Sequence, residues 1–293
     1  MSGTPAAEIS VSIDLVRALI EDQLPQYASL PIRRAGEGWD NFTFRLGDDL
    51  AARLPRRAAA AILILNEQLA LPRLAARLPL LTPAPVAIGK PGAGYPWSWS
   101  IVPWIAGEPS DLAPPDIFQG SILARFLRAL HQPADADAPL NPYRGVALAD
   151  RVQMVTTRLD SVRSGTDLIT AAVDTLWLDA LAAPRSTDRV WLHGDLHAQN
   201  VLTQNGSFAG VIDWGDVCAG DPATDLAAIW GLLPDRQARA AAIADYAPDD
   251  ELLSRARGWA VFFGVVLYDA GRINNPRHMA VGEAILRRLA ADF

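Results

Sequence analysis

Two short polar segments, His193 to Asn200 and Asp213 to Gly215, carry the side chains of this chain that are best suited to chemistry. Each segment follows a short apolar run, Val190 to Leu192 in the first case and Val211 to Ile212 in the second. Apolar runs of this length, bounded by polar residues and glycine, are typical of short buried strands. The sequence therefore predicts two strands that deliver polar side chains at their ends.

The residue types in these segments match the needs of phosphoryl transfer. That reaction needs an aligned hydroxyl, metal ions across the phosphates and stabilisation of charge, with little covalent help from the protein. Asp195 can accept the hydroxyl proton, while Asn200 and Asp213 offer the hard oxygen ligands that Mg²⁺ prefers. Asn200 lies five residues after Asp195, as in the kinase pattern H-R-D-L-x-x-x-N, and Asp213 takes the place of the D-F-G aspartate.

The pattern resembles the aminoglycoside phosphotransferase family, whose members share the protein-kinase-like fold. That family favours His-Gly-Asp-x-His-x-x-Asn, as in His193 to Asn200, over the His-Arg-Asp of protein kinases. The segment Asp221 to Ala227 also resembles the family's Asp-Pro-x-x-Asp-Leu-Ala run. The likeness follows the whole chain in lobe order and is most specific from Trp191 to Ala227. Gly194 and His197 argue against a protein kinase that is regulated through its activation loop.

The resemblance implies roles for individual residues. It makes Asp195 the expected catalytic base and His193 a residue that braces the loop. It also makes Asn200 and Asp213 the expected magnesium ligands.

Three other polar residues of this region have structural explanations that compete with catalytic ones. Asp221 followed by Pro222 is a pair that begins many helices, with Asp as N-cap and Pro in the first turn. We therefore expect a structural role for Asp221, and we expect the same for Asp225. His197 is expected to act as a hydrogen-bonding residue rather than as a proton carrier.

On the nucleotide side, kinases place a strand residue against the α- and β-phosphates and pair it with a glutamate of the next helix. Lys90, the only lysine, lies beyond that helix and cannot take this role. We expect Arg53 to take it, because Ala51 and Arg53 share one face of a strand and match the Ala-x-Lys pattern. Glu67 is the expected partner. Arg and Lys differ at a fixed site, so surface roles for Arg53 and Glu67 stay open as the alternative.

The purine base is expected at the short strand from Ile101 to Ile105, which links the two halves of the chain. The resemblance implies that backbone groups of this strand meet the purine edge. Pro103 has no N–H to donate, so the donor is expected at Val102 or Trp104.

Gly36 to Asn41 lies where a phosphate-covering loop would lie, but a simple β-turn fits it nearly as well. These residues do not distinguish ATP from GTP.

The first third of the chain has a β-rich pattern. Apolar residues at helical spacing indicate a helix over 13–24, and alternating residues indicate a β-hairpin over 42–54. A helix over 57–71 is expected to end at Pro72, before two more short strands over 83–88 and 98–105.

After Gly107 the pattern is mainly helical, with apolar residues at three- and four-residue spacing over 117–130 and 168–181. We therefore expect an α+β, bilobal protein-kinase-like fold. A small β-rich N-terminal lobe, residues 1–105, would bind the nucleotide. A larger, mainly helical C-terminal lobe, residues 106–293, would carry catalysis and substrate binding.

Composition limits the partners and the compartment. The 293 residues carry a formal net charge of −7 and no Lys/Arg run longer than a pair, so no nucleic-acid partner is expected. Cys218 is the only cysteine, and Met1 to Ser10 lack the pattern of a signal peptide. The apolar run Trp259 to Tyr268 is about half of the ~20 residues needed to cross a bilayer. We expect a cytoplasmic protein with no membrane association and no obligate protein partner.

These observations predict a small-molecule kinase that uses Mg²⁺ and transfers the γ-phosphate of ATP or GTP to a hydroxyl group. An aminoglycoside-type antibiotic, with resistance as the outcome, is the leading acceptor, and its positive charges would suit an acidic pocket. The candidate carboxylates for that pocket are Asp235, Asp249, Asp250, Glu251, Asp269, Glu283 and Asp292. The alternatives are a macrolide, a choline-like alcohol or a sugar as acceptor, or an inactive nucleotide-binding scaffold.

Overall fold

The computed structural model describes residues 6–293 and divides them into two compact units. The β-rich unit comprises the described chain up to Ala106 together with Val211–Gly215. The helical unit comprises Gly107–Gly210 and Asp216–Phe293. Residues 1–5, on which part of the expectation about a signal peptide rests, lie outside the described residues.

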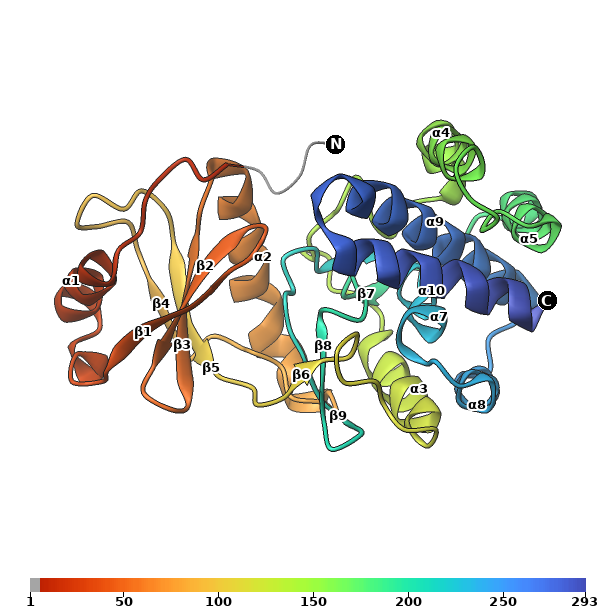
Figure 1. Ribbon diagram of the computed structural model, residues 1–293. Coiled ribbons are helices and arrows are strands. Elements are labelled where there is room, and N and C mark those ends of the chain that lie inside the picture. Colours follow the sequence, from red (N-terminus) through yellow and green to blue (C-terminus); the bar gives the residue numbers. More distant parts are fainter. Residues whose placement is uncertain (1–5) are drawn as a thin grey trace. The chain divides into compact units, whose positions relative to one another are not determined.

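The β-rich unit is built on one antiparallel sheet of five strands in the order β1-β2-β3-β5-β4 (Figure 1). The strands are β1 (Ile32–Glu37), β2 (Asn41–Leu46), β3 (Leu50–Pro55), β4 (Ala87–Gly89) and β5 (Trp99–Pro103). The expected hairpin is the β2–β3 pair, with Thr43 opposite Arg53. Its turn contains Gly47 at φ 57°, a left-handed backbone that glycine adopts without steric cost.

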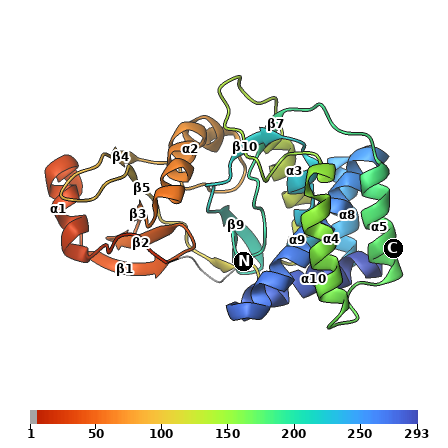
Figure 2. The same cartoon turned by 90° about the horizontal axis from the view of Figure 1, so that it is seen from above.

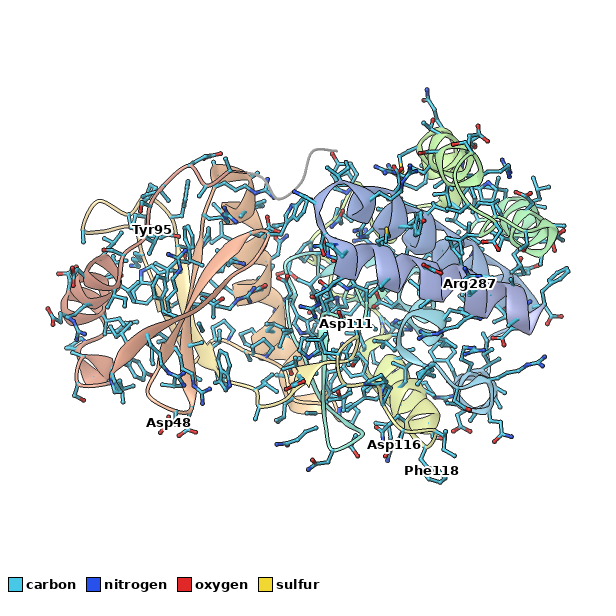
Figure 3. The ribbon with its side chains drawn as sticks, in the orientation of Figure 1. Asp48, Tyr95, Asp111, Asp116, Phe118 and Arg287 are labelled. Carbon is cyan, nitrogen blue, oxygen red and sulfur yellow. The ribbon has the colours of Figure 1, made fainter. Side chains whose placement is uncertain are left out.

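Two helices cover opposite faces of this sheet (Figures 1 and 2). Helix α1 (Ile13–Gln23) buries Leu19 and Ile20 against Phe44 and Trp99, in one apolar core. At the edge of this core the hydroxyl of Tyr95, labelled in Figure 3, donates to the carbonyl of Pro55 at 2.8 Å. Because side chains alternate along β2 and β3, the opposite face is left for polar residues.

Helix α2 (Ala58–Leu74) covers that second face and is longer than expected. The sequence placed its end at Pro72, but the helix continues through Pro72 to Leu74. Pro72 has no N–H to donate, but the helix resumes its hydrogen bonds beyond it, since the N–H of Ala75 donates to the carbonyl of Leu71, and Leu71 and Leu74 are both buried. Short 3₁₀ turns flank these elements at Pro25–Tyr27 and Ala75–Arg77.

The segment Ala58–Arg77, which contains α2, is the one stretch of the described residues with the length and apolar composition of a membrane span. Core helices of soluble proteins pass the same test, and 33% of its most apolar window is buried. The apolar run Trp259 to Tyr268 is helical and almost wholly buried, as expected.

The helical unit contains most of the helices and a few short strands (Figure 1). The helices are α3 (Gln119–Leu130), α4 (Val152–Arg163), α5 (Ala171–Ala182), α6 (Ala223–Leu226), α7 (Ala228–Leu232), α8 (Arg236–Tyr246), α9 (Asp250–Asn274) and α10 (Pro276–Asp292), with a 3₁₀ turn at Leu148–Arg151. The strands are β6 (Glu108–Pro109), β7 (Val190–Leu192), β8 (Val201–Gln204), β9 (Ser207–Val211) and β10 (Cys218–Gly220). They form an antiparallel β7–β10 pair and a small sheet in the order β6-β8-β9.

Glycine permits close approach where α3 meets α8. A Cβ on Gly120 of α3 would lie 2.2 Å from the carbonyl oxygen of Ala238 in α8. By contrast, a Cβ on Gly231 of α7 would meet no atom nearer than Ile285 Cδ1, at 3.9 Å. Both glycines are buried and helical, so the two positions differ mainly in the space beside them.

We predict that Gly120→Ala lowers the free energy of unfolding by about 1–3 kcal/mol, because the added methyl must push α8 away. Gly231→Ala is the matched control and should be neutral or stabilising by up to about 1 kcal/mol, since alanine favours a helix. Denaturant unfolding followed by circular dichroism measures both. Equal stability of the two variants would contradict the close α3–α8 packing.

Candidate active site

A sharp turn after β7 presents Asp195. Strand β7 is fixed by pairing with β10, where Leu192 lies opposite Cys218. The chain then turns through Gly194 at φ 84°, where a Cβ would lie 2.5 Å from the carbonyl oxygen of Asp216. Both the left-handed backbone and the close approach exclude a side chain, which explains glycine at this position.

The carboxylate of Asp225 holds this turn from behind. It is fully buried and accepts hydrogen bonds from the backbone N–H of His193 at 2.6 Å and of Gly194 at 2.9 Å. His131 Nε2 lies 3.6 Å from the same carboxylate, and His131 Nδ1 lies 2.8 Å from the hydroxyl of Tyr246. Asp225 therefore has a structural role, as we expected: it holds the backbone of the turn that presents Asp195.

Asp221 is structural as well. Its carboxylate accepts from the backbone N–H of Ala223 at 3.1 Å, close to the start of α6. It also forms a buried ion pair with Arg255 Nε at 2.8 Å. An Asp that satisfies a helix terminus and pairs with a buried guanidinium needs no catalytic explanation.

Both oxygens of the Asp195 carboxylate have partners in the helical unit. Oδ1 accepts from Nη2 of Arg144 at 2.9 Å, and Oδ2 lies 3.3 Å from Nε2 of His197. Asn200 Nδ2 lies 3.4 Å from Oδ2 and donates to the backbone carbonyl of Asp195 at 2.9 Å. Burial alone would raise the pKa of Asp195, but the charges of His197 and Arg144 hold it well below the usual range. The carboxylate is thus ionised and fixed in orientation.

The two expected metal ligands lie in different units, and each has the donor chemistry that Mg²⁺ needs. Because Nδ2 of Asn200 donates to Asp195, its amide oxygen is the remaining acceptor. Asp213, at φ 60°, keeps 44% of its side chain exposed, and its Oδ1 accepts from Arg53 at 3.1 Å. Carboxylate and amide oxygens are suitable magnesium ligands. Among the described residues, no group of three or more His, Cys, Asp and Glu is arranged for a metal ion.

Arg53 and Glu67 form a buried ion pair in the β-rich unit, as their positions in the sequence suggested. Arg53 Nη1 donates to Glu67 Oε2, and Arg53 Nη2 reaches Asp213. Burial opposes the charge of Arg53, but Glu67 and Asp213 together raise its pKa above the usual value. Burial raises the pKa of Glu67 to about 7, and the attraction of Arg53 works against that rise. Arg53 is thereby held between two carboxylates.

The structure gives the two expected purine donors other partners. Strand β5 runs between β3 and β4, and Val86 N donates to Ile101 O on the β4 side. Since backbone groups alternate in direction along a strand, the N–H of Val102 points to β3, where Val102 lies opposite Ala51.

The N–H of Trp104 donates to the carbonyl of Asp49 at 2.7 Å. The same alternation directs the carbonyl of Pro103 away from β3. This carbonyl, with the N–H of Ile105 just after the strand, replaces Val102 and Trp104 as the backbone candidate for the purine edge. The sequence did not reveal this, because it does not show which side of a strand its neighbour occupies.

Five of the carboxylates proposed for an acidic pocket cap helices or form ion pairs. Asp235 and Asp249 cap α8 and α9, where each accepts from backbone N–H groups of the first turn. Asp269 pairs with Arg158 at 2.6 Å, and Glu283 with Arg287 of α10, labelled in Figure 3. Asp292 binds Arg239 through Nε at 2.6 Å.

Asp250 and Glu251, the other two candidates, lie in the first turn of α9, where negative charge favours the helix dipole. Asp292 lines a pocket together with Trp230 and Arg257, and an acidic acceptor pocket stays a prediction. The residue that sequence reasoning missed is Arg144, which lies in a loop between α3 and α4 and belongs to no kinase pattern. Its position beside Asp195 arises only when a loop distant in sequence packs against the β7 turn.

Comparisons with known proteins agree on one family. Viomycin phosphotransferase of Streptomyces vinaceus is 38% identical over 97 residues, which is 32% of this chain and 31% of that protein. An aminoglycoside 3'-phosphotransferase of Escherichia coli is 32% identical over 118 residues, which is 38% of this chain and 42% of that protein. The chain thus matches less than half of the length of these curated relatives.

Solved structures show the fold over nearly the whole chain. The GDP complex of aminoglycoside 2'-phosphotransferase-IIIa has a TM-score of 0.67 at 20% identity and covers 95% of this chain and 98% of its own. Macrolide 2'-phosphotransferase type I has a TM-score of 0.58 at 20% identity, and the match covers 96% of this chain and 99% of that protein. The expected α+β, protein-kinase-like fold is confirmed. The sequence pattern of the phosphotransferase enzyme family matches residues 31–259, most of the chain, and the chain therefore belongs to that family.

Proposed function

We propose that this protein transfers the γ-phosphoryl group of ATP or GTP to a hydroxyl group of a small molecule. The observation that carries the proposal is the carboxylate of Asp195, which a glycine turn presents and which neighbouring side chains hold by both oxygens. A fixed, ionised carboxylate at the end of a strand is what the alignment of an acceptor hydroxyl requires.

In the proposed reaction the acceptor oxygen forms a bond to the γ-phosphorus. The bond from that phosphorus to the bridging oxygen breaks, and the nucleoside diphosphate leaves. Asp195 orients the hydroxyl and takes its proton as the new bond forms. His193 and Gly194 position Asp195 through their backbone N–H groups, which Asp225 holds.

The nucleotide is assigned to the β-rich unit. Arg53 would contact the α- and β-phosphates, and Glu67 would keep its guanidinium in place. The carbonyl of Pro103 and the N–H of Ile105 would meet the purine. Asn200 and Asp213 would hold Mg²⁺, which when bound neutralises charge on the phosphates. The division of labour between residues 1–105 and 106–293 is part of this proposal.

An aminoglycoside-type antibiotic is the leading acceptor class, and antibiotic resistance is the corresponding role. Relatives named for viomycin and aminoglycoside phosphorylation support it. A macrolide is the second candidate, supported by likeness in fold to a macrolide phosphotransferase. The proposal includes a cytoplasmic location and small-molecule partners only, with no nucleic acid or membrane. A choline-like alcohol, a sugar and an inactive scaffold are further outcomes of the test.

The test is phosphate transfer from ATP and from GTP, with and without Mg²⁺, across viomycin, aminoglycosides, macrolides, choline and simple sugars. Mass spectrometry of the acceptor identifies the product, and release of nucleoside diphosphate gives the rate. Phosphorylation of one class that depends on Mg²⁺ supports the proposal. Nucleotide binding without transfer to any acceptor would favour the inactive scaffold instead.

We predict that Asp195→Asn lowers turnover with the best acceptor by about 10²-fold or more, because the amide cannot accept the proton. Nucleotide affinity should stay within a few-fold of the wild type. Asp269→Asn is the control, since it neutralises another paired aspartate of the helical unit. Steady-state kinetics measure all three proteins, and a variant at position 195 that keeps most of its activity would exclude Asp195 as the base.

We predict that Glu67→Gln raises the KM for the nucleotide by about 10-fold, because loss of one carboxylate lets Arg53 move away from the phosphates. The change keeps the size of the side chain. Asp48→Asn is the control, since Asp48 is an aspartate of the same unit, in the exposed β2–β3 turn (Figure 3). An unchanged KM in Glu67→Gln would show that the ion pair has no part in nucleotide binding.

A further inference from the structure

The loop that carries Arg144 is built into the helical unit. The side-chain oxygen of Asn141 accepts from the backbone N–H groups of Tyr143 at 2.8 Å and Arg144 at 3.2 Å, which forms a closed local turn. Gly145 follows at φ 66°, and its N–H donates to Thr224 Oγ1 at 3.2 Å. Its carbonyl accepts from Asp221 N at 3.1 Å. The position of the Arg144 backbone is therefore fixed by α6 and the segment before it.

The guanidinium of Arg144 is held as firmly as its backbone. It lies over the rings of Phe263 and Phe262, 5.2 and 5.6 Å from their centroids, in the range of cation–π contacts. Its side chain is only 18% exposed, and one of its nitrogens donates to Asp195. Contacts with two aromatic rings, together with the hydrogen bond to Asp195, leave the guanidinium little freedom to move away from the carboxylate.

The other carboxylates near Asp195 are also compensated. Asp111 makes two hydrogen bonds to Arg277, at 2.8 and 2.7 Å, and Asp216 accepts from Asn141 at 2.7 Å. Figure 3 labels Asp111 in the helical unit. The imidazole of His278 lies edge-on to that of His197, with centroids 6.0 Å apart. The surroundings of Asp195 thus contain two arginines and several imidazoles, and each of these carboxylates has a donor.

We propose that Arg144 is a positioning and specificity residue of the acceptor site. It holds Oδ1 of Asp195 and excludes an ammonium group from the place beside the acceptor hydroxyl. The acceptors that this site selects therefore carry an uncharged or anionic group next to the hydroxyl that is phosphorylated. This inference rests on the proposed function, because it names the chemical surroundings of the hydroxyl in that reaction.

The physical basis is competition for one carboxylate. An ammonium group that paired with Asp195 would have to displace the guanidinium of Arg144 or lie beside it, and like charges at close range repel strongly. A hydroxyl needs only one lone pair of the carboxylate, and an oxygen that already accepts one hydrogen bond still has another. Arg144 thus permits a hydroxyl and rejects a cation at the same atom. In an aminoglycoside, this favours a hydroxyl whose ring neighbours carry no amine.

The test is the binding of kanamycin and of its fully N-acetylated, uncharged derivative by titration calorimetry, with Arg144→Gln compared to the wild type. We expect Arg144→Gln to bind kanamycin about 10-fold more tightly, because it frees the half-buried carboxylate of Asp195 for an ammonium group. Affinity for the acetylated derivative should stay within a few-fold. Arg144→Lys keeps the positive charge, so it should not show the gain in kanamycin affinity that the neutral variant shows.

Two controls separate this effect from a change in net charge or in folding. Arg158→Gln removes an arginine that pairs with Asp269 in the same unit, and should leave kanamycin affinity unchanged. Adding Asp195→Asn to Arg144→Gln should abolish the gain. Arg144→Met, whose side chain can still pack on the phenylalanine rings, gives the same readout if the glutamine variant does not fold, which thermal unfolding reveals.

The inference is overturned if both neutral variants bind kanamycin no more tightly than the wild type, or if Arg158→Gln gives an equal gain. These binding results decide the role of Arg144 whether or not phosphate is transferred. Failure of the proposed function is a separate outcome, since it would appear as nucleotide binding without transfer to any acceptor.

Discussion

The buried carboxylate of Asp225 is the constraint on which the site of the helical unit depends. It accepts two backbone hydrogen bonds from the β7 turn and so determines where Asp195 is placed. A short carboxylate is suited to this role because one rigid group can satisfy two adjacent N–H donors that burial would otherwise leave unpaired. Gly194 makes the turn sterically possible, and Asp225 makes it stable.

The same short segment of chain also fixes the partner of Asp195. Asp221 and Thr224 hold the backbone of Gly145, and thereby the loop that presents Arg144. The segment itself is anchored by the ion pair of Asp221 with Arg255 of α9. One segment of five residues, 221–225, therefore positions both members of the Asp195–Arg144 pair, although the two residues lie 51 positions apart.

Much of the site was predictable because its chemistry is encoded in short spacings. The interval from Asp195 to Asn200, the D-F-G position of Asp213 and the strand alternation that places Ala51 and Arg53 on one face are local patterns. Glu67 follows from the kinase pattern that pairs the strand residue with a glutamate of the next helix. The predicted helix end at Pro72 was wrong: the helix continues to Leu74, whose side chain is buried together with that of Leu71.

The features that the sequence did not reveal depend on contacts between residues that are far apart in the chain. The donors at Val102 and Trp104 were misplaced because their N–H groups are used by β3 and by Asp49, which only the sheet register reveals. Several of the carboxylates expected in a pocket also cap helices or form ion pairs, as Asp235 and Asp292 show, and the sequence did not reveal these partners. The net charge of −7 for the whole chain does not give the charge of one site, since the local charge depends on the groups that lie beside each carboxylate.

The central claim, that Asp195 receives the acceptor hydroxyl, is tested most directly by a crystal structure. The crystal should contain Mg²⁺, a non-hydrolysable nucleotide and the acceptor that the transfer assay identifies. We predict that the reactive hydroxyl oxygen lies within hydrogen-bond distance of the Asp195 carboxylate and points to the γ-phosphate. An ordered acceptor whose hydroxyl meets another residue, with Asp195 engaged only by Arg144 and His197, would contradict it.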